Sequence, residues 1–255
     1  MTDRRFNIWI ITLFPGYFEP YLEFGVAGAA LKGERGVNFK LHLVNIATHS
    51  DKDWKGIDSA PYGGGAGMVM RADVLKNTII NGVVRPGNYG DNFREKLHVV
   101  YTSPRGRKWN NESCMEFAKK LWSSDSKKDL VLICGRYEGL DERFIKNYVD
   151  EEISVGDYVL TGGEIPVLCI LDSALRFVPG VLGNKDSLSH ESFGEGLLEH
   201  PQYTRPQVFE GEDVPGILLS GHHANIEKYR KEERIRITKE NRADLFEKYL
   251  NGGLE

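Results

Sequence analysis

Residues 6–14 of this chain read FNIWIITLF, an almost continuous run of apolar and β-branched residues. A run of this kind is typical of a strand that is buried on both faces, as strands of a parallel sheet are. Four later segments have a similar composition, namely 37–46, 97–102, 130–134 and 155–160. The sequence therefore predicts five strands in a mostly parallel sheet.

Helical spacing of apolar residues occurs between and after these strands. Residues 111–122 form one apolar face. Residues 166–178 begin with Pro166 in a first turn and stop before a Pro-Gly pair. Strands that alternate with helices indicate an α/β fold, which we place in a first domain at 1–182.

Composition changes after this domain. We interpret residues 183–198 as a flexible linker, because most of this segment is polar and glycines flank its polar stretch at 183–196. Residues 199–255 are expected to form a small all-α domain, with one or two helices within 221–250. Between Lys228 and Arg242, seven Lys or Arg residues stand against three Glu residues, a local charge of 7 − 3 = +4.

Bulk properties exclude several classes of protein. The chain has 255 residues and a formal net charge of −4, which argues against a protein that coats nucleic acid along its whole surface. No apolar run approaches the roughly 18–20 residues of a membrane helix, and no signal peptide is recognised, so a cytoplasmic location without membrane contact is expected. The three scattered cysteines indicate neither a disulfide framework nor a zinc site, and no other metal cluster is visible.

Glycine clusters follow the predicted strands. They are PYGGGAG at 61–67, SPRGR at 103–107, GRYEG at 135–139, and Gly156-Asp157 with TGGE at 161–164. Ligands of open α/β sheets bind at the carboxyl ends of strands, where glycine lets the backbone approach them. Each cluster alone could equally be a turn. Neither a GxGxxG fingerprint nor a GxxxxGK[ST] loop occurs, so no dinucleotide or nucleoside triphosphate is indicated.

Longer blocks of the sequence resemble the bacterial tRNA (guanine-N1)-methyltransferase family, a knotted (SPOUT-type) methyltransferase family. The blocks follow one another in the family's order over roughly residues 7 to 230. They are PYGGGAGMVM at 61–70, SPRGR at 103–107, CGRYEGLDER at 134–143, SVGDYVLTGGEIP at 154–166, FVPGVLG at 177–183, GLLEHPQYTRP at 196–206 and VPGILLSGHHANIEKYR at 214–230.

The resemblance implies a C-terminal trefoil knot in the α/β domain and a homodimer with active sites shared between subunits. It implies methyl transfer from S-adenosyl-L-methionine to N1 of the guanosine immediately 3′ of the tRNA anticodon, when another guanosine precedes it. Magnesium assistance is implied as well, through few protein ligands or through the RNA. The residues carried over as cofactor-binding are Ser103, Pro104, Gly135, Tyr137, Glu138, Val155, Gly156, Asp157, Tyr158, Val159, Leu160, Gly162, Gly163 and Pro166.

The resemblance also assigns the chemistry. N1 of guanine carries a proton at neutral pH, so a general base must remove it. The family has an aspartate as base, for which Glu191 stands here, and an arginine that corresponds to Arg176. A solvated linker charge is the alternative for Glu191, and His190 is a rival base. Arg176 lies four residues after Asp172, a spacing that suits a structural ion pair.

Several residues are expected to contact RNA. His222 stands where a helix could point at phosphate, and Lys228, Arg230 and Lys231 belong to the basic stretch after it. The alternative for this stretch is an ordinary solvated helix face. Two further residues are weaker candidates for the target base or its phosphates, namely Asp58 and Arg136.

Two departures from the family pattern lie near the cofactor segments. Ala66 stands where proline is usual and Arg105 where glutamine is usual. Two other functions stay open: a catalytically silent RNA- or nucleotide-binding module, which only the Glu191 change favours, and a related knotted enzyme that methylates ribose hydroxyls. The long match through the linker and C-terminal blocks argues against the second.

Overall fold

The chain divides into two compact units, Met1–Gly183 and Asn184–Glu255, in a computed structural model that describes residues 5–35, 38–50, 56–123, 125–182 and 191–252. In the first unit, five parallel strands form one sheet in the order β2-β1-β6-β5-β7. The strands are β1 (Phe6–Thr12), β2 (Phe39–Asn45), β5 (Leu97–Lys108), β6 (Asp129–Cys134) and β7 (Glu151–Ser154). The predicted α/β class with a parallel sheet is confirmed.

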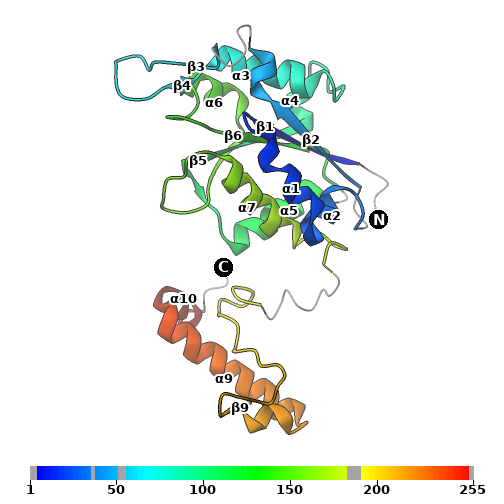
Figure 1. Ribbon diagram of the computed structural model, residues 1–255, viewed down its shortest axis with the longest axis vertical. Coiled ribbons are helices and arrows are strands. Elements are labelled where there is room, and N and C mark those ends of the chain that lie inside the picture. Colours follow the sequence, from blue (N-terminus) through cyan, green and yellow to red (C-terminus); the bar gives the residue numbers. More distant parts are fainter. Residues whose placement is uncertain (1–4, 36–37, 51–55, 124, 183–190, 253–255) are drawn as a thin grey trace. The chain divides into compact units, whose positions relative to one another are not determined.

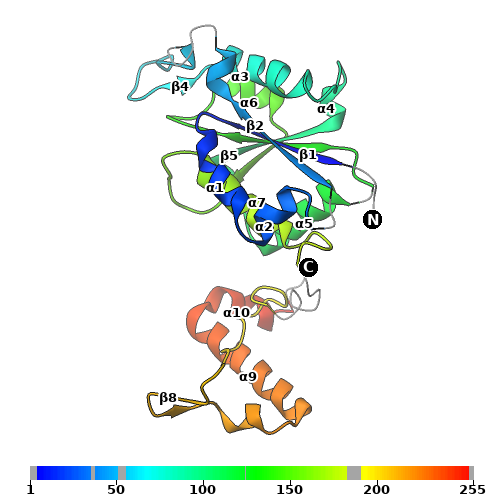
Figure 2. The same cartoon turned by 45° about the vertical axis from the view of Figure 1, so that its right-hand side comes forward.

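Helices cover both faces of this sheet (Figures 1 and 2). One face carries α1 (Glu19–Glu23), α2 (Gly25–Leu31), α5 (Asn111–Trp122) and α7 (Glu164–Leu175). The other face carries α3 (Ala72–Thr78), α4 (Phe93–Lys96) and α6 (Glu142–Tyr148). The shorter elements of this unit are η1 (Pro15–Tyr17), η2 (Ile46–His49), β3 (Asp58–Ser59), β4 (Val69–Met70) and a π-helical turn, η4 (Ile79–Val84).

Strand β1 explains why the unit has two cores. Successive side chains of a strand point to opposite faces of the sheet. Ile8 and Ile10 pack into the core that includes α5 and α7, whereas Trp9 and Ile11 pack into the core that includes α3 and α6. All four side chains are almost completely buried. The apolar run at the start of the chain thus requires helices on both sides.

The fifth strand differs from the prediction. Residues 155–160 are not a strand, and β7 lies just before them at Glu151–Ser154. The two glutamates that begin β7 interrupt the apolar pattern by which a buried strand is predicted. Because β7 is an edge strand, its charged side chains can reach solvent and partners. From Val155 onward the chain continues as a loop, in which Gly156 has φ +158.

Strand β5 extends beyond the predicted 97–102 and is interrupted. Its register against β7 shifts between Thr102 and Arg107, so that both residues face Ile153 and the residues between them leave the ladder. The backbone at Gly106 runs so close to β7 that a Cβ there would lie 2.5 Å from the carbonyl carbon of Glu152. Residues 103–106 therefore bulge out of the regular ladder within β5, and we call them the raised loop.

The two predicted helices of this unit are confirmed, α5 with the predicted bounds and α7 with shifted bounds. Helix α5 begins after Asn110, whose side chain accepts from the Ser113 amide at 2.9 Å, while the Ser113 hydroxyl accepts from the Asn110 amide at 2.7 Å. This reciprocal capping box explains the sharp start. Helix α7 begins at Glu164, two residues before Pro166, which is still in the first turn, and ends at Leu175.

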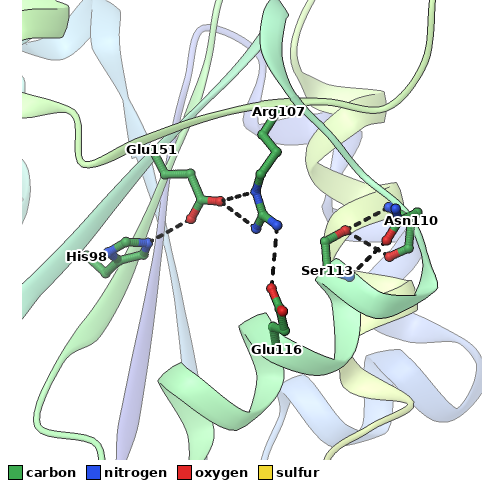
Figure 3. A network of polar contacts seen from close by, with 6 residues as sticks. All are labelled: His98, Arg107, Asn110, Ser113, Glu116 and Glu151. Atoms are coloured by element: carbon green, nitrogen blue, oxygen red, sulfur yellow. Dashed lines mark hydrogen bonds and ion pairs between the residues drawn. The ribbon is translucent and has the colours of Figure 1, made fainter. Parts of the chain in front are cut away.

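A polar network ties the raised end of β5 to β7 and to α5 (Figure 3). Glu151 accepts from Arg107 Nη2 at 2.9 Å and lies 3.2 Å from His98 Nε2, while Arg107 also reaches Glu116 of α5 at 3.5 Å. His98 is almost completely buried. The His98 contact, followed by the Arg107 guanidinium, lowers the pKa of Glu151 to about 2.

Replacing Glu151 by Gln is expected to lower the free energy of unfolding by about 1–2 kcal/mol at pH 7, because the charge-assisted bonds to Arg107 and His98 are lost. The folded-state pKa of Glu151 lies below its ordinary value of 4.5, so the stabilisation is complete above that value and is lost as the pH falls toward 2. Chemical denaturation at pH 7 and pH 3 measures this.

The difference between wild type and Glu151→Gln should therefore narrow at pH 3. The matched control is Glu116→Gln, because Glu116 is 62% exposed and its ion pair is long. The stabilising role of Glu151 would be contradicted by an equal loss of stability in both variants at pH 7. A difference between wild type and Glu151→Gln that does not change with pH would contradict it as well.

The second unit contains α9 (His223–Asn241), α10 (Ala243–Leu250), the turn η5 (Gly216–Leu219) and a small hairpin of β8 (Val208–Phe209) with β9 (Glu212–Asp213). The helices within 221–250 are confirmed, but the hairpin shows that the expectation of a purely helical unit was wrong in this detail. Arg234 is buried in the unit and pairs with Glu195 at 2.6 Å. Among the described residues, no helix is long and apolar enough to cross a membrane.

Candidate functional site

A pocket of about 360 Å³ opens at the carboxyl ends of β5, β6 and β7. Three loops line it: the raised loop after Thr102, residues 135–140 after β6, and residues 155–163 after β7. Because the strands are parallel and adjacent, their carboxyl ends lie at one edge of the sheet. The glycine clusters of the sequence are thereby gathered around one site.

Almost all the residues that were carried over as cofactor-binding line this pocket. They are Ser103, Pro104, Gly135, Tyr137, Glu138, Val155, Gly156, Tyr158, Val159, Leu160, Gly162, Gly163 and Pro166. Asp157 is the exception, because it lies at the outer turn of its loop, where its exposed carboxylate stands 3.5 Å from Lys108 Nζ. A contact of Asp157 with the methyl donor stays a prediction.

Backbone contacts hold the three loops together. The Gly163 amide donates to the carbonyl of Gly135 at 2.9 Å, which joins the loop after β7 to the loop after β6. A Cβ at Gly163 would lie 2.5 Å from Thr102 Oγ1 and 2.6 Å from Cys134 Cα. Only glycine permits this approach, and it leaves the neighbouring peptide groups exposed to a ligand.

The glycine-rich segment at 61–70 supports the same pocket from outside. The Glu138 amide donates to Met68 O at 2.9 Å, and the Met70 amide donates to Gly139 O at 2.9 Å. Tyr137, which precedes Glu138, has φ +58, an unusual conformation for a residue with a side chain. The residue is 55% exposed and belongs to the pocket wall. Such backbone conformations are concentrated at functional sites.

Arg136 lines the pocket and belongs to a buried ion pair. Arg136 Nη2 lies 2.7 Å from Glu164 Oε2, and Glu164, which is 1% exposed, also accepts from Thr12 Oγ1 at 2.7 Å. The Arg136 guanidinium lies 4.4 Å above the ring of Phe14. Since a buried carboxylate needs a partner, the first role of Arg136 is to neutralise Glu164. A contact of Arg136 with RNA stays a prediction.

Sequence reasoning missed the buried contacts of Glu164 with Thr12 and with Arg136, a residue of the pocket wall. Glu164 and Thr12 lie more than a hundred residues apart in the chain, and neither belongs to a spacing pattern that would reveal the pair. Only the contact of β1 with the first turn of α7 brings them together.

Arg105 lies at the mouth of the pocket, where the family has an uncharged residue. Its Nη2 is 3.0 Å from Glu142 and 3.5 Å from Glu152. The hydrogen bond to Glu142, followed by the charge of Glu152, raises the pKa of Arg105. The additional positive charge is therefore balanced by two carboxylates.

The two candidate catalytic residues lie in different units. Arg176 is the half-buried residue that directly follows α7, and Glu191 is a half-buried residue near the start of the second unit. The Glu191 carbonyl accepts from the Gly194 amide at 3.2 Å. Asp172 accepts from the Tyr21 hydroxyl at 2.7 Å. His190, the rival base, lies outside the described residues.

Most of the basic residues at 228–242 are engaged in ion pairs. Arg230 pairs with Glu227 and Arg242 with Asp244, while Arg236 bonds to both Glu233 and Glu240. Lys228 lies 3.9 Å from Glu232. Lys231 and Lys239 have no acidic partner within the described part of the chain. The charge available for phosphate is thus smaller than the count of +4 suggests.

The remaining RNA candidates are placed as follows. His222 is the exposed residue that precedes α9, so a helix does begin where the sequence predicted. Asp58 lies in β3 and pairs with Met70 of β4. The Met70 amide in turn donates to Gly139 O in the loop at 135–140. Neither residue lines the pocket.

The described residues contain no group of three His, Cys, Asp or Glu side chains that could hold a metal ion. Magnesium assistance through few protein ligands or through the RNA stays a prediction.

Comparison with known proteins gives a single picture. The model of the family "tRNA (Guanine-1)-methyltransferase TrmD" matches residues 6–248. A tRNA (guanine-N(1)-)-methyltransferase of Clostridioides difficile is 43% identical over 96% of this chain and 98% of its own length. Proteins of the same name from Clostridium novyi and Rhizobium etli are each 45% identical, over 94% and 95% of this chain and over 91% and 96% of their own lengths.

Proposed function

The chain belongs to the tRNA (guanine-1)-methyltransferase family, and from this premise we propose that it methylates N1 of a guanine in tRNA with S-adenosyl-L-methionine as the methyl donor. The guanosine is the one immediately 3′ of the anticodon, and another guanosine precedes it. The observation that carries the proposal is the pocket at the carboxyl ends of β5, β6 and β7, which collects the family's cofactor segments from three separate places in the chain.

The pocket has the properties that this donor requires. Its volume of about 360 Å³ falls within the range of small-molecule sites, and its walls combine apolar side chains with exposed peptide groups. Tyr158 is 56% exposed and Val159 is 83% exposed, so apolar surface is available for the flat adenine. Glu138 supplies a carboxylate to the same wall, which suits the positively charged part of the donor.

The chemistry is a direct transfer. The sulfonium supplies a methyl group that is already activated, so the bond from sulfur to methyl breaks as the bond from guanine N1 to methyl forms. The N1 proton goes to the Glu191 carboxylate. Negative charge develops toward O6 of the guanine, and the Arg176 guanidinium stabilises it in this proposal. The resemblance to the family supports the roles of both residues.

We also propose the trefoil knot, with support from the path of the chain after β7. This strand lies at the edge of the sheet beside β5, yet the following Gly163 bonds to Gly135 after the central β6. Residues 155–162 therefore return across the end of β5, where residues 103–106 leave the ladder. A trace of residues 97–166 in an experimental density map tests the threading.

A homodimer with shared active sites is a further part of the proposal. Apolar side chains remain exposed in the first unit at Phe14, Tyr17, Phe24 and Ile165, with exposed fractions between 40% and 73%. The Arg136 guanidinium joins Phe14 and Tyr17 to Glu164, the neighbour of Ile165. A sedimentation measurement should give twice the mass of one chain, and a monomer at micromolar concentration would contradict this part.

RNA is held by the second unit in this proposal, with Lys228 and Lys231 of α9 as phosphate contacts and His222 at the start of that helix. Phosphate contacts of this kind give affinity that falls with salt and does not depend on sequence. Because the substrate is tRNA, we place the reaction in the cytoplasm.

The test is transfer of labelled methyl from S-adenosyl-L-methionine to two tRNA transcripts. One transcript carries the guanosine pair beside the anticodon, and the other has adenosine as the first member of that pair. Label in the first transcript only, mapped to guanine N1, is the expected result. A folded protein that binds the donor and labels neither transcript would instead favour the silent binding module, for which the glutamate at position 191 is the supporting observation.

A further inference from the structure

The second unit contains a pocket of its own, of about 440 Å³, that the reaction described above does not use. Its floor is apolar and includes Val214, Leu218 and Ile226, and the last of these is 9% exposed. All its lining residues belong to 200–230, so the pocket is complete within this unit. An apolar floor of this size suits a flat ring rather than an extended ion.

An aromatic side chain stands at the rim of this pocket. Tyr203 lines it, and its ring remains 46% exposed. An aromatic ring next to an apolar floor is the arrangement on which proteins stack an unpaired nucleobase.

Two guanidinium groups complete the rim. Arg205 and Arg230 both line the pocket, and no carboxylate does so. Arg205 has no ion pair with any residue of the described chain. Arg230 bonds to Glu227 through Nη1, but its Nε is buried without a hydrogen-bond partner among the described residues. A buried N–H group without a partner calls for an acceptor, and a phosphate oxygen is one.

The other arginines of this unit do not offer the same opportunity. Arg234 is buried against Glu195, and Arg236 is held by two glutamates on its own helix. Among the described arginines of this unit, those that keep a donor for an anion therefore lie beside the aromatic rim.

We propose that this pocket binds one unstacked nucleotide of the substrate tRNA, with the base against Tyr203 and the apolar floor and with its phosphate on Arg205 and Arg230. The proposal rests on the proposed function, since it assumes that tRNA is the substrate. It assigns base stacking to the second unit in addition to phosphate contact, and it leaves the methyl donor to the first unit.

Binding of a labelled tRNA transcript to the full-length protein, measured by fluorescence anisotropy at several salt concentrations, tests this. Tyr203→Ala should raise the Kd for tRNA by about 5- to 150-fold, the cost of one lost stacking contact, and leave the salt dependence unchanged. Tyr203→Phe should bind as the wild type does. Arg205→Ala should reduce the slope of log K against log salt by about 0.7–0.9, the equivalent of one phosphate.

The controls are Phe209→Ala and Arg236→Ala, an exposed aromatic residue and a paired arginine of the same unit that do not line the pocket. Both should bind tRNA as the wild type does, and every variant should keep the wild-type Kd for S-adenosyl-L-methionine. Equal Kd values for tRNA in Tyr203→Ala and Phe209→Ala, with methyl transfer by the wild type intact, would overturn the pocket alone. A wild-type protein that neither binds nor methylates tRNA would overturn the proposed function and the pocket with it.

Discussion

Replacement of Glu191 by Gln is expected to lower kcat for tRNA methylation by about 10²–10⁴-fold, the usual contribution of a general base. Glutamine keeps the size and polarity of the side chain but cannot accept the N1 proton. The Kd for S-adenosyl-L-methionine should not change, because the residues that line the donor pocket all belong to the first unit. Single-turnover kinetics with saturating tRNA separates the chemical step from binding.

Two variants make this measurement specific. Glu191→Asp restores the carboxylate that is usual in the family and should retain most of the activity. Glu210→Gln, at the exposed turn between β8 and β9, removes a carboxylate of the same unit and should behave as the wild type does. Unchanged turnover in Glu191→Gln would remove Glu191 as the base, and a loss in His190→Gln instead would assign that role to His190.

Replacement of Arg176 by Ala is expected to reduce kcat by about 10²–10³-fold, the cost of removing one group that stabilises charge in a transition state. Arg176 directly follows the last turn of α7. The core face of this helix is buried against the sheet, so the backbone of Arg176 is held in place. Arg176→Lys should recover part of the loss, because lysine restores the charge but not the planar fork of donors. Quench-flow measurement of methyl transfer gives the rate.

The alternative for Arg176 is a purely structural ion pair with Asp172, and Asp172→Asn tests it. If Arg176 acts on the reaction, Arg176→Ala lowers kcat while Asp172→Asn does not. If it acts only on stability, both variants lower the melting temperature by similar amounts and turnover by folded protein is unchanged. Lys119→Ala, an exposed cation of α5, is the control for the loss of a positive charge. In the variant lacking both Arg176 and Glu191, the loss should be smaller than the product of the single losses, since both groups act in one transition state.

Local sequence was sufficient wherever one pattern decided the structure. The apolar run at 6–14 predicted a strand buried on both faces, and the structure places β1 between two cores. Helix α5 has the predicted bounds because a capping box starts it and one apolar stripe continues to its end. The glycine clusters marked the loops of the donor pocket, since a parallel sheet brings the carboxyl ends of its strands to one edge.

Local sequence failed where distant residues decide the outcome. Strand β7 begins with two glutamates, and only their partners in β5, namely His98, Arg105 and Arg107, explain why charge is tolerated there. The short helices α3 and α6 were not predicted, because they are stabilised by packing on the sheet more than by their own sequences. The count of basic residues in α9 likewise overstated the charge available to RNA, since a count does not include ion pairs within the unit.

The sequence by itself determined the fold class, the family and the segments that line the first pocket, because each of these is written in contiguous runs of residues. Only the tertiary structure decided that Arg136 neutralises the buried Glu164, that Asp157 does not line the first pocket, and that Tyr203 shares a second pocket with Arg230. The physical reason is the same in each case. Burial and pairing depend on which side chains meet across the folded chain, and such meetings leave no periodic trace in the sequence.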